Sequence, residues 1–587
     1  MKKAIVRILA TLGAIYLIAI VATLVVLQSR KPHVPRKTIL EVNLETPLTE
    51  YVPNEAVAQA MLKDRTSVLD IVEALERGGN DDRVVGLVAR LGAQPQGMAQ
   101  VQEIRNAVIA FRAKKKFAIA FSETFGEFGP GNSSYYLATA FDQVWMQPSG
   151  DIGLTGIMLE SPFVSGTLEK LGMKFHGDHR YEYKTALDLF TQKKYTPAAR
   201  EENSAIINSW FSQMRDGICA ARGIPPNQFQ AVVDHAPYLG KEALDAKLVD
   251  GLGYRDEVYD QVKKRAGGDA KLFYLDRYLE GAGRPHEKGK TIALVYGVGA
   301  VQRGKGGFDP LTGGGGMGSE TVAAALRAAT EDKKVKAILF RVDSPGGSYV
   351  ASDTIWREVG RARAAGKPVI VSMGNLAGSG GYFVAMSADK IVAQPGTITA
   401  SIGVLGGKFL TSGLWNKLGL SWDEVHTGAN ASMWTGTMDY TPQEWARFET
   451  WLDRVYSDFT NKVADGRHLP KNKVLEIAKG RIWSGQDAKN LGLVDELGGF
   501  PEALKLAKKA AGIPEQEEVK LEVFPRKKNI VETLLAGSPD NSEKEATTQA
   551  MVGVLKSFQP VFRALKVAGV TDQGENVLRM PEQQAGR

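Results

Sequence analysis

The sequence is poor in the residues that form cross-links and metal centres. Among its 587 residues there is a single cysteine, Cys219, which excludes an internal disulfide framework and a multi-cysteine zinc or iron–sulfur site. Hydrophobic residues make up 43% and charged residues 24%, which is ordinary globular usage and excludes a wholly disordered, collagen-like or polytopic membrane chain. At roughly 150 residues per domain, the length allows about four domains or two large ones with appendages.

Acidic residues are absent from the first part of the chain. The 73 basic and 66 acidic residues leave a net charge of +7, and all seven surplus charges precede residue 38. They are Lys2, Lys3, Arg7, Arg30, Lys31, Arg36 and Lys37. The remaining chain balances at 66 charges of each sign, so the composition gives no support to a basic surface for nucleic acid.

Residues 8–27 carry no charge and are bracketed by basic residues. Twenty helical residues span roughly 30 Å of hydrocarbon, so this run predicts a transmembrane anchor. A removable signal peptide would have a shorter apolar core and a small-residue cleavage site, and residues 28–30 offer no convincing one. Basic residues on both sides leave the positive-inside rule undecided. The short flank 1–7 is expected in the cytoplasm, which places the body outside the inner membrane of a bacterium.

The rest of the chain contains one unit twice. Residues 131–157 align without a gap on residues 378–404, and seven of the 27 positions are identical. Two further pairs of segments keep the same spacing: 83–91 with 334–342, and 247–253 with 492–498. A spacing near 250 residues indicates a duplicated domain and not a solenoid. We place the copies at 38–280 and 290–510, followed by an extension over 511–587.

Each copy alternates short apolar runs with longer helical stretches. In the second copy, strands are expected at 335–342 and 368–373, with a helix over 349–365 between them. This order predicts an α/β fold with mainly parallel strands and helices on both faces. The glycine-rich segments 281–290 and 303–318 are expected to be a linker and a mobile loop. The glycine run within the second of these lacks the Gly-Lys-Ser/Thr ending of a phosphate loop.

Chemistry in a duplicated domain is expected where matched positions differ. After Val342 the second copy reads Asp343-Ser344-Pro345-Gly346-Gly347-Ser348, while its counterpart at 92–96 lacks the paired glycines. Glycines at a strand-to-helix turn let bare N–H groups approach a ligand, which is how an oxyanion hole is built. A tight turn without function is the alternative interpretation.

A second difference lies at Ser379, which the first copy replaces by Asn132. Ser379 stands between Gly378 and Gly380 at a strand-to-helix junction, where a serine is exposed at the positive end of the helix dipole. This resembles a nucleophile elbow. Gly-Ser-Gly strings are common in loops, so a capping or loop serine is the alternative.

A serine nucleophile needs a base, and the sequence offers two kinds. His426 and His468 lie downstream of Ser379, in the order of an α/β-hydrolase. Lys184 lies among aromatic and aliphatic residues, while the second copy has no lysine between Lys417 and Lys462. A lysine base must lose its proton, so burial would have to lower its pKa from about 10.4 by roughly 2–3 units. A lysine lying over aromatic rings is the alternative. With Lys184 the two copies are complementary, as in one composite Ser-Lys site.

Five motifs together resemble the signal peptide peptidase A family, peptidase family S49, in its long duplicated form that is also called protease IV. They are residues 343–348, 378–382, 401–403, 183–186 and 480–485. The resemblance implies a Clp/crotonase-like fold in each copy, one transmembrane helix, and a catalytic body in the periplasm. It also implies a homotetramer that degrades cleaved signal peptides and other hydrophobic peptides without a metal or cofactor.

By motif, the resemblance gives Ser379 the place of the nucleophile and Lys184 that of the general base. Ser401 matches a serine that holds the lysine, and the amides of Gly346, Gly347 and Gly380 match the oxyanion donors. The sequence has Gly378 where alanine is common and Thr185 where serine is common. Three alternatives stay open: a non-enzymatic membrane scaffold, a crotonase-like enzyme acting on acyl thioesters, and a Ser-His hydrolase.

Overall fold

The computed structural model describes residues 31–52, 61–62, 65–92, 96–309, 314–526 and 578–579. The predicted flank 1–7, the predicted anchor 8–27 and most of the predicted extension lie outside these ranges. Within the described residues, no helix has both the length and the apolar character needed to cross a membrane.

The first copy contributes a six-stranded sheet in which every neighbouring pair is parallel. Its strand order is β8-β4-β3-β2-β1-β9. The strands are β1 (Thr38–Leu44), β2 (Val84–Leu91), β3 (Phe117–Ser122), β4 (Gln143–Met146), β8 (Gly251–Leu252) and β9 (Lys271–Tyr274). Their central residues are hydrophobic and almost fully buried, as parallel strands covered on both faces require.

The second copy repeats this order as β21-β17-β16-β14-β10-β22 and adds β18 and β20 at the other end of β16. The strands are β10 (Lys290–Val298), β14 (Val335–Ser344), β16 (Val369–Gly378), β17 (Lys390–Ala393), β18 (Ile398–Ala400), β20 (Ile482–Ser484), β21 (Glu496–Leu497) and β22 (Val519–Phe524). The shared order is the structural counterpart of the repeated sequence, and the architecture is mixed α/β as predicted.

Helices cover both sheets. Those of the first copy include α3 (Val68–Gly79), α4 (Met98–Ala113), α5 (Asn132–Ala138), α9 (Phe229–His235), α10 (Gly240–Asp245), α11 (Arg255–Arg265) and α12 (Leu275–Ala282). Those of the second copy are α13 (Ser319–Glu331), α14 (Tyr349–Ala364), α15 (Gly380–Ala385), α17 (Pro442–Arg467), α18 (Lys471–Ile477), α19 (Gly485–Leu491) and α20 (Phe500–Ala510).

Matching polar contacts stabilise the two cores. The buried Tyr135 hydroxyl on α5 donates to the Leu248 carbonyl at 2.7 Å, and the buried Tyr382 hydroxyl on α15 donates to the Leu493 carbonyl at 2.9 Å. Because a buried hydroxyl without a partner is costly, the two copies have kept the same solution at the same place.

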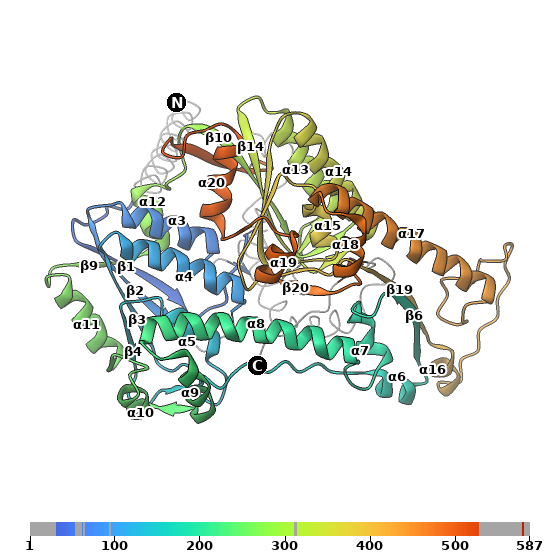
Figure 1. Cartoon of the computed structure of the whole chain (residues 1–587), viewed down its shortest axis with the longest axis horizontal. Helices are drawn as coiled ribbons and strands as arrows, with labels where there is room; N and C mark the ends of the chain where they lie inside the picture. The colour runs from blue at the N-terminus through green and yellow to red at the C-terminus, as the bar shows by residue number, and fades with distance from the viewer. Residues whose placement is uncertain are drawn as a thin grey trace, which may run out of the picture.

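Two elements join the copies. The long helix α8 (Pro197–Arg222) runs beneath both sheets in Figure 1. Strand β6 (Lys174–Arg180) of the first copy pairs antiparallel with β19 (Val404–Leu410) of the second over seven residues each. With α6 (Ser165–Leu171), α7 (Asp188–Thr191), α16 (Ser412–Lys417) and α17, this ribbon forms an arm that projects to the right of the figure.

Two strands of a small five-stranded sheet lie in the segment where a mobile loop was expected. Part of the segment 303–318 forms β12 (Phe308–Asp309) and β13 (Gly314–Gly318), which pair with each other, and β13 also pairs with β11 (Ala300–Gln302). Glycines permit this because the backbones approach closely: a Cβ on Gly318 would lie 1.7 Å from the Gly306 nitrogen. The sheet continues through β15 (Gly346–Gly347) to β23 (Leu578–Arg579).

Candidate active site

The structure brings Lys184 of the first copy against two serines of the second. Lys184 Nζ lies 2.8 Å from Ser379 Oγ, 2.9 Å from Ser401 Oγ and 3.0 Å from the Ser401 carbonyl oxygen. All three side chains are buried, and Lys184 and Ser379 have no exposed surface. A neutral lysine amine has two N–H groups and one lone pair. Donation of both N–H groups to Ser401 leaves the lone pair directed at the Ser379 hydroxyl.

The β6–β19 ribbon explains why residues so distant in sequence meet. Its register pairs Arg180 with Val404, so Lys184 follows one strand of the ribbon while Ser401 precedes the other. Gly480 packs directly against Lys184, because a Cβ on residue 480 would lie 2.5 Å from Lys184 Cβ. Its φ of 82° is also one that favours glycine.

Ser379 occupies a strained backbone position between β16 and α15. Its φ is 54° and its ψ is −113°, which is rare for a residue with a side chain. Ala400 and Ser401 also have positive φ values, 68° and 51°, and the Ser379 amide donates to the Ala400 carbonyl at 2.7 Å. Strain of this kind persists where surrounding contacts over-determine it, and it concentrates at functional sites.

The three glycines assigned to an oxyanion hole lie together beside Ser379. A Cβ on Gly380 would lie 3.0 Å from the Gly347 nitrogen and 3.1 Å from Gly346 Cα, so the turn before α15 and strand β15 are in contact. Gly346 and Gly347 have φ values of 93° and 153°. The Gly346 amide donates to Ser344 Oγ at 3.2 Å, and the Gly347–Ser348 turn is held by donation from the Ser348 amide to the Val301 carbonyl.

Burial controls the charge of the lysine. It lowers the pKa of Lys184 to about 7, and the nearby Glu202 carboxyl opposes this by a smaller raising effect. Lys184 therefore exchanges its proton near neutral pH, as a general base requires.

Glu202 is a neighbour of the site that motif comparison did not identify. Its carboxyl accepts the Thr185 hydroxyl at 2.9 Å and the Ile482 amide at 3.3 Å, and burial raises its pKa to about 8. The spacing of residues in the sequence could have indicated it, because Glu202 lies on the buried face of α8 together with Ala199 and Ile206. An acid on the apolar face of an amphipathic helix needs a specific partner.

The two candidate histidines are placed elsewhere. His426 lies in the exposed segment after α16, where its ring faces Glu424 at 3.9 Å. His468 is the C-cap residue of α17, with a φ of 53°. The atom that the structure places against Ser379 Oγ is Lys184 Nζ.

The model of the family described as peptidase family S49 matches the chain twice, over residues 113–268 and 361–514. The chain belongs to peptidase family S49. It is a serine protease with a duplicated S49 domain, and the two matches correspond to the two copies in the fold.

Three S49 relatives illustrate the similarity. The chloroplastic serine protease SPPA of Arabidopsis thaliana is 31% identical over 80% of this chain and 70% of its own. Protease 4 of Salmonella typhi is 33% identical over 80% of this chain and 75% of its own. A putative signal peptide peptidase SppA of Enterococcus faecium is 36% identical over 31% of this chain and 54% of its own.

Among solved structures, a ClpP1 mutant from Listeria monocytogenes covers 37% of this chain and 95% of its own. The sequence identity is 15% and the TM-score 0.22, which is too low to bear on the fold. The Clp/crotonase-like description of each copy stays a prediction.

Proposed function

We propose that this S49 protease cleaves peptide bonds with a Ser379–Lys184 dyad. Neutral Lys184 Nζ takes the proton of the Ser379 hydroxyl as that oxygen attacks a peptide carbonyl, and the protonated amine then gives the proton to the leaving nitrogen. Water, activated in the same way, hydrolyses the resulting ester. The observation that carries the proposal is the 2.8 Å contact between the two atoms, with both N–H groups of the neutral amine accepted by Ser401.

The oxyanion of the intermediate is stabilised by backbone N–H groups of Gly347 and Gly380, because the Gly346 amide, which the sequence also suggested as a donor, already donates to Ser344 Oγ at 3.2 Å. These residues lie against one another at the N-terminus of α15, beside the nucleophile. Fixed amide dipoles act strongly in such a buried place, because water does not screen them and they need not reorient during the reaction.

Substrate is expected to bind as an extended strand along β15. The described strand β23 pairs antiparallel with Gly346 and Gly347, which supports the idea that this edge accepts an extended chain. Main-chain pairing of this kind binds peptides with little dependence on sequence. An endopeptidase that degrades varied peptides needs this property.

The substrates that we propose are cleaved signal peptides and other hydrophobic segments. A lysine kept neutral by burial requires an apolar surrounding, and the same surrounding favours apolar peptides. Val350 at the start of α14 and Tyr181 near Lys184 are both at least half exposed, and offer apolar surface on the segments that carry the site. The name of the Enterococcus faecium relative, a putative signal peptide peptidase, agrees with this substrate class.

The location that we propose is the bacterial inner membrane, with residues 8–27 as a single anchor and the body in the periplasm. The uncharged run with its basic flanks is the support for this proposal. Protease accessibility of the body in spheroplasts, compared with intact cells, tests the location.

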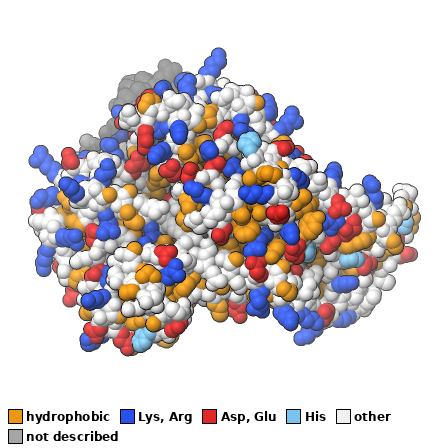
Figure 2. All heavy atoms as spheres, viewed as in Figure 1, with side chains coloured by type: hydrophobic (Ala, Val, Ile, Leu, Met, Phe, Trp, Pro, Cys, Tyr) orange, Lys and Arg blue, Asp and Glu red, His pale blue; other side chains and the backbone are white. Residues whose placement is uncertain are grey.

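A homotetramer is proposed as the assembled form. Exposed apolar side chains are concentrated in the segment after α16, where Trp422 and Trp434 keep 63% and 65% of their surface exposed. Figure 2 shows hydrophobic side chains among the charged ones out to the end of the arm. Exposed aromatic groups of this number favour a subunit interface. Sedimentation velocity of the wild type and of Trp422→Glu tests it, since a lost interface lowers the sedimentation coefficient.

The dyad is tested with Ser379→Ala and Lys184→Ala in the full-length chain, assayed on a fluorogenic hydrophobic peptide. We expect each variant to lose about 10⁴-fold or more in kcat, and the double variant to lose little more, because the two groups act as a unit. Ser379→Ala should also escape labelling by a fluorophosphonate. Wild-type turnover in either variant would refute the dyad.

A further inference from the structure

Strand β14 leads to the oxyanion glycines and strand β16 leads to Ser379. The pairing between these two strands is interrupted shortly before both sites. Strand β14 pairs with β16 in regular register up to Val342 and Met373, and pairing resumes only at Ser344 and Ala377. Residues 374–376 therefore form a bulge in the ladder with β14, just before Ser379, while Leu376 pairs with Ile398 on β18. A bulge breaks the ladder and leaves backbone amides that need other acceptors.

Asp343 supplies those acceptors. Its carboxylate accepts the Leu376 amide at 2.9 Å and also the Asn375 amide. Gly374 makes room for it, since a Cβ there would lie 3.0 Å from Asp343 Cβ and Cγ. Asp343 lies three residues before Gly346, so one side chain ties the end of the oxyanion strand to the end of the nucleophile strand. The first copy has Gly92 at the matched position.

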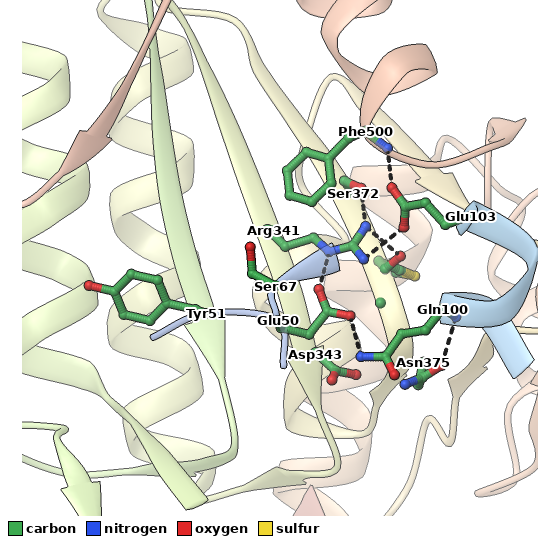
Figure 3. A network of polar contacts seen from close by, with 12 residues as sticks. Glu50, Tyr51, Ser67, Gln100, Glu103, Arg341, Asp343, Ser372, Asn375 and Phe500 are labelled. Atoms are coloured by element: carbon green, nitrogen blue, oxygen red, sulfur yellow. Dashed lines mark hydrogen bonds and ion pairs between the residues drawn. The ribbon is translucent and has the colours of Figure 1, made fainter. Parts of the chain in front are cut away.

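The first copy holds the bulge from outside. The Asn375 side chain accepts the Gln100 amide at 3.0 Å and so caps the N-terminus of α4, and it lies where Gly97 leaves space for it. Gln100 in turn donates to Glu50 at 2.9 Å. Figure 3 shows the contacts of Gln100 with Asn375 and with Glu50, and Asp343 beside them.

A buried cation faces these acids. Arg341 on β14 is fully buried and contacts Glu50 at 2.8 Å and Glu103 on α4 at 2.9 Å. Glu103 also accepts the Phe500 amide at the start of α20. A buried ion network of this kind contributes little net stability compared with apolar packing, but it fixes one arrangement of its parts.

We propose that Asp343 is a positioning residue, whose ionised carboxylate holds the Gly346–Gly347 turn so that the Gly347 amide lies at the right distance from Ser379. The inference rests on the proposed dyad and oxyanion hole. It gives the first copy a second task besides supplying Lys184, because Glu50, Gln100 and Glu103 hold the ends of both strands.

The same surroundings make the contact sensitive to pH. Burial, with a smaller effect of Glu50, raises the pKa of Asp343, while Arg341 and the two backbone amides oppose the rise. Tyr296 on β10 and Glu103 are the further ionisable groups around Arg341 and Glu50. A proton on Asp343 weakens an acceptor that two amides need, so turnover should fall with acid at this group as well as at Lys184.

The test is Asp343→Asn in the full-length chain, with kcat and KM measured on a fluorogenic hydrophobic peptide between pH 5 and 9. We expect kcat to fall about 10- to 100-fold, less than the ~10²–10³-fold loss of an oxyanion donor itself, with KM changed by less than about threefold. Over the one to two pH units in which Asp343 takes up its proton, the wild-type plot of log kcat should approach a slope of about two, while that of the variant keeps a slope of about one.

Asp389→Asn is the matched control. Asp389 accepts the Val369 amide at 2.8 Å and pairs with Arg363, at the opposite end of the same strand β16. Turnover of Asp343→Asn within about twofold of this control, a loss confined to KM, or equal slopes in wild type and variant would overturn the proposal.

If Asp343→Asn fails to fold, the variant Gly374→Ala tests the positioning role of Asp343 instead. It keeps every polar group and displaces the Asp343 carboxylate by a few tenths of an ångström, so kcat should fall several-fold; unchanged kcat would refute the role. Ser379→Ala in the same assay tests the dyad separately, because turnover that survives this change contradicts the proposed function and not the role of Asp343 alone.

Discussion

Lys184 Nζ and Ser379 Oγ lie 2.8 Å apart although 195 residues separate them along the chain. The contact depends on the ribbon that joins the copies, since Lys184 follows β6 and Ser401 precedes β19. Neither sheet holds both groups. The pair that we propose as reactive therefore depends on the junction between the copies.

The rate should depend on pH through the lysine. The value of kcat/KM for a hydrophobic peptide should rise with pH and level off above about pH 7, because Lys184 acts only when neutral and burial lowers its pKa to about 7. In acid it should fall at least about tenfold per pH unit. An acid limb near pH 10 would contradict the assignment.

Lys184→Met should make the folded protein more stable at pH 6.5. The pKa is lower in the folded than in the unfolded chain, so the unfolded chain binds more protons between about pH 7 and 10.5, and stability rises with pH through that window. Removing the amine should therefore add about 2–4 kcal/mol at pH 6.5, within the ~5 kcal/mol that such a shift represents.

Calorimetric melting temperatures at pH 6.5 and 9.5 test this. The advantage of Lys184→Met should shrink at the higher pH. If the melting temperature of Lys184→Met is below that of the wild type at both pH 6.5 and pH 9.5, burial of the lysine does not lower the stability of the folded protein.

Ser401→Ala should slow catalysis without weakening binding. The Ser401 hydroxyl is one of two acceptors for the amine, at 2.9 Å, and the carbonyl remains in the variant. We expect kcat to fall about 10- to 100-fold with KM nearly unchanged, as for the loss of an orienting contact. Ser387→Ala, which removes another buried hydroxyl of the second copy, is the control and should keep wild-type kcat. Equal kcat values in the two variants would exclude a role for Ser401.

Peptides should compete with the chain's own strand for β15. Two strands cannot pair with the same edge, and β23 pairs with Gly346 and Gly347. A chain that ends before Leu578 should bind the peptide substrate with a lower KM and an unchanged kcat. A chain that ends after Arg579 is the control and should keep the wild-type KM. The same KM in both shortened chains would mean that substrate binds elsewhere.

Much of the fold could be predicted because the sequence repeats itself. The segment 335–342 lies within strand β14, 349–365 corresponds to α14 (Tyr349–Ala364), and 368–373 overlaps the first half of β16 (Val369–Gly378). These patterns depend on neighbours along the chain, which periodicity reports directly. The family and the serine protease activity were also predicted correctly, while the anchor and the tetramer stay predictions.

The surroundings of the dyad were harder to predict. Glu202 and Asp343 act through partners on other elements, and burial, which no local pattern measures, raises the pKa of both. The glycine-rich segment 303–318 was wrongly expected to be a loop throughout. Its glycines form β13 because the adjacent backbones need the space that side chains would fill.

Lys184 belongs to the first copy and Ser379 to the second, so the two groups are synthesised at different times. Synthesis runs from the N-terminus, so the amine of Lys184 emerges long before the hydroxyl of Ser379, and Gly480, which packs on the lysine, emerges later still. If Lys184 and Ser379 form the catalytic pair, as we propose, an unfinished polypeptide that ends before Ser379 has no complete active site. The proposed enzyme would then be unable to cleave its own nascent chain until both copies had been made and folded together.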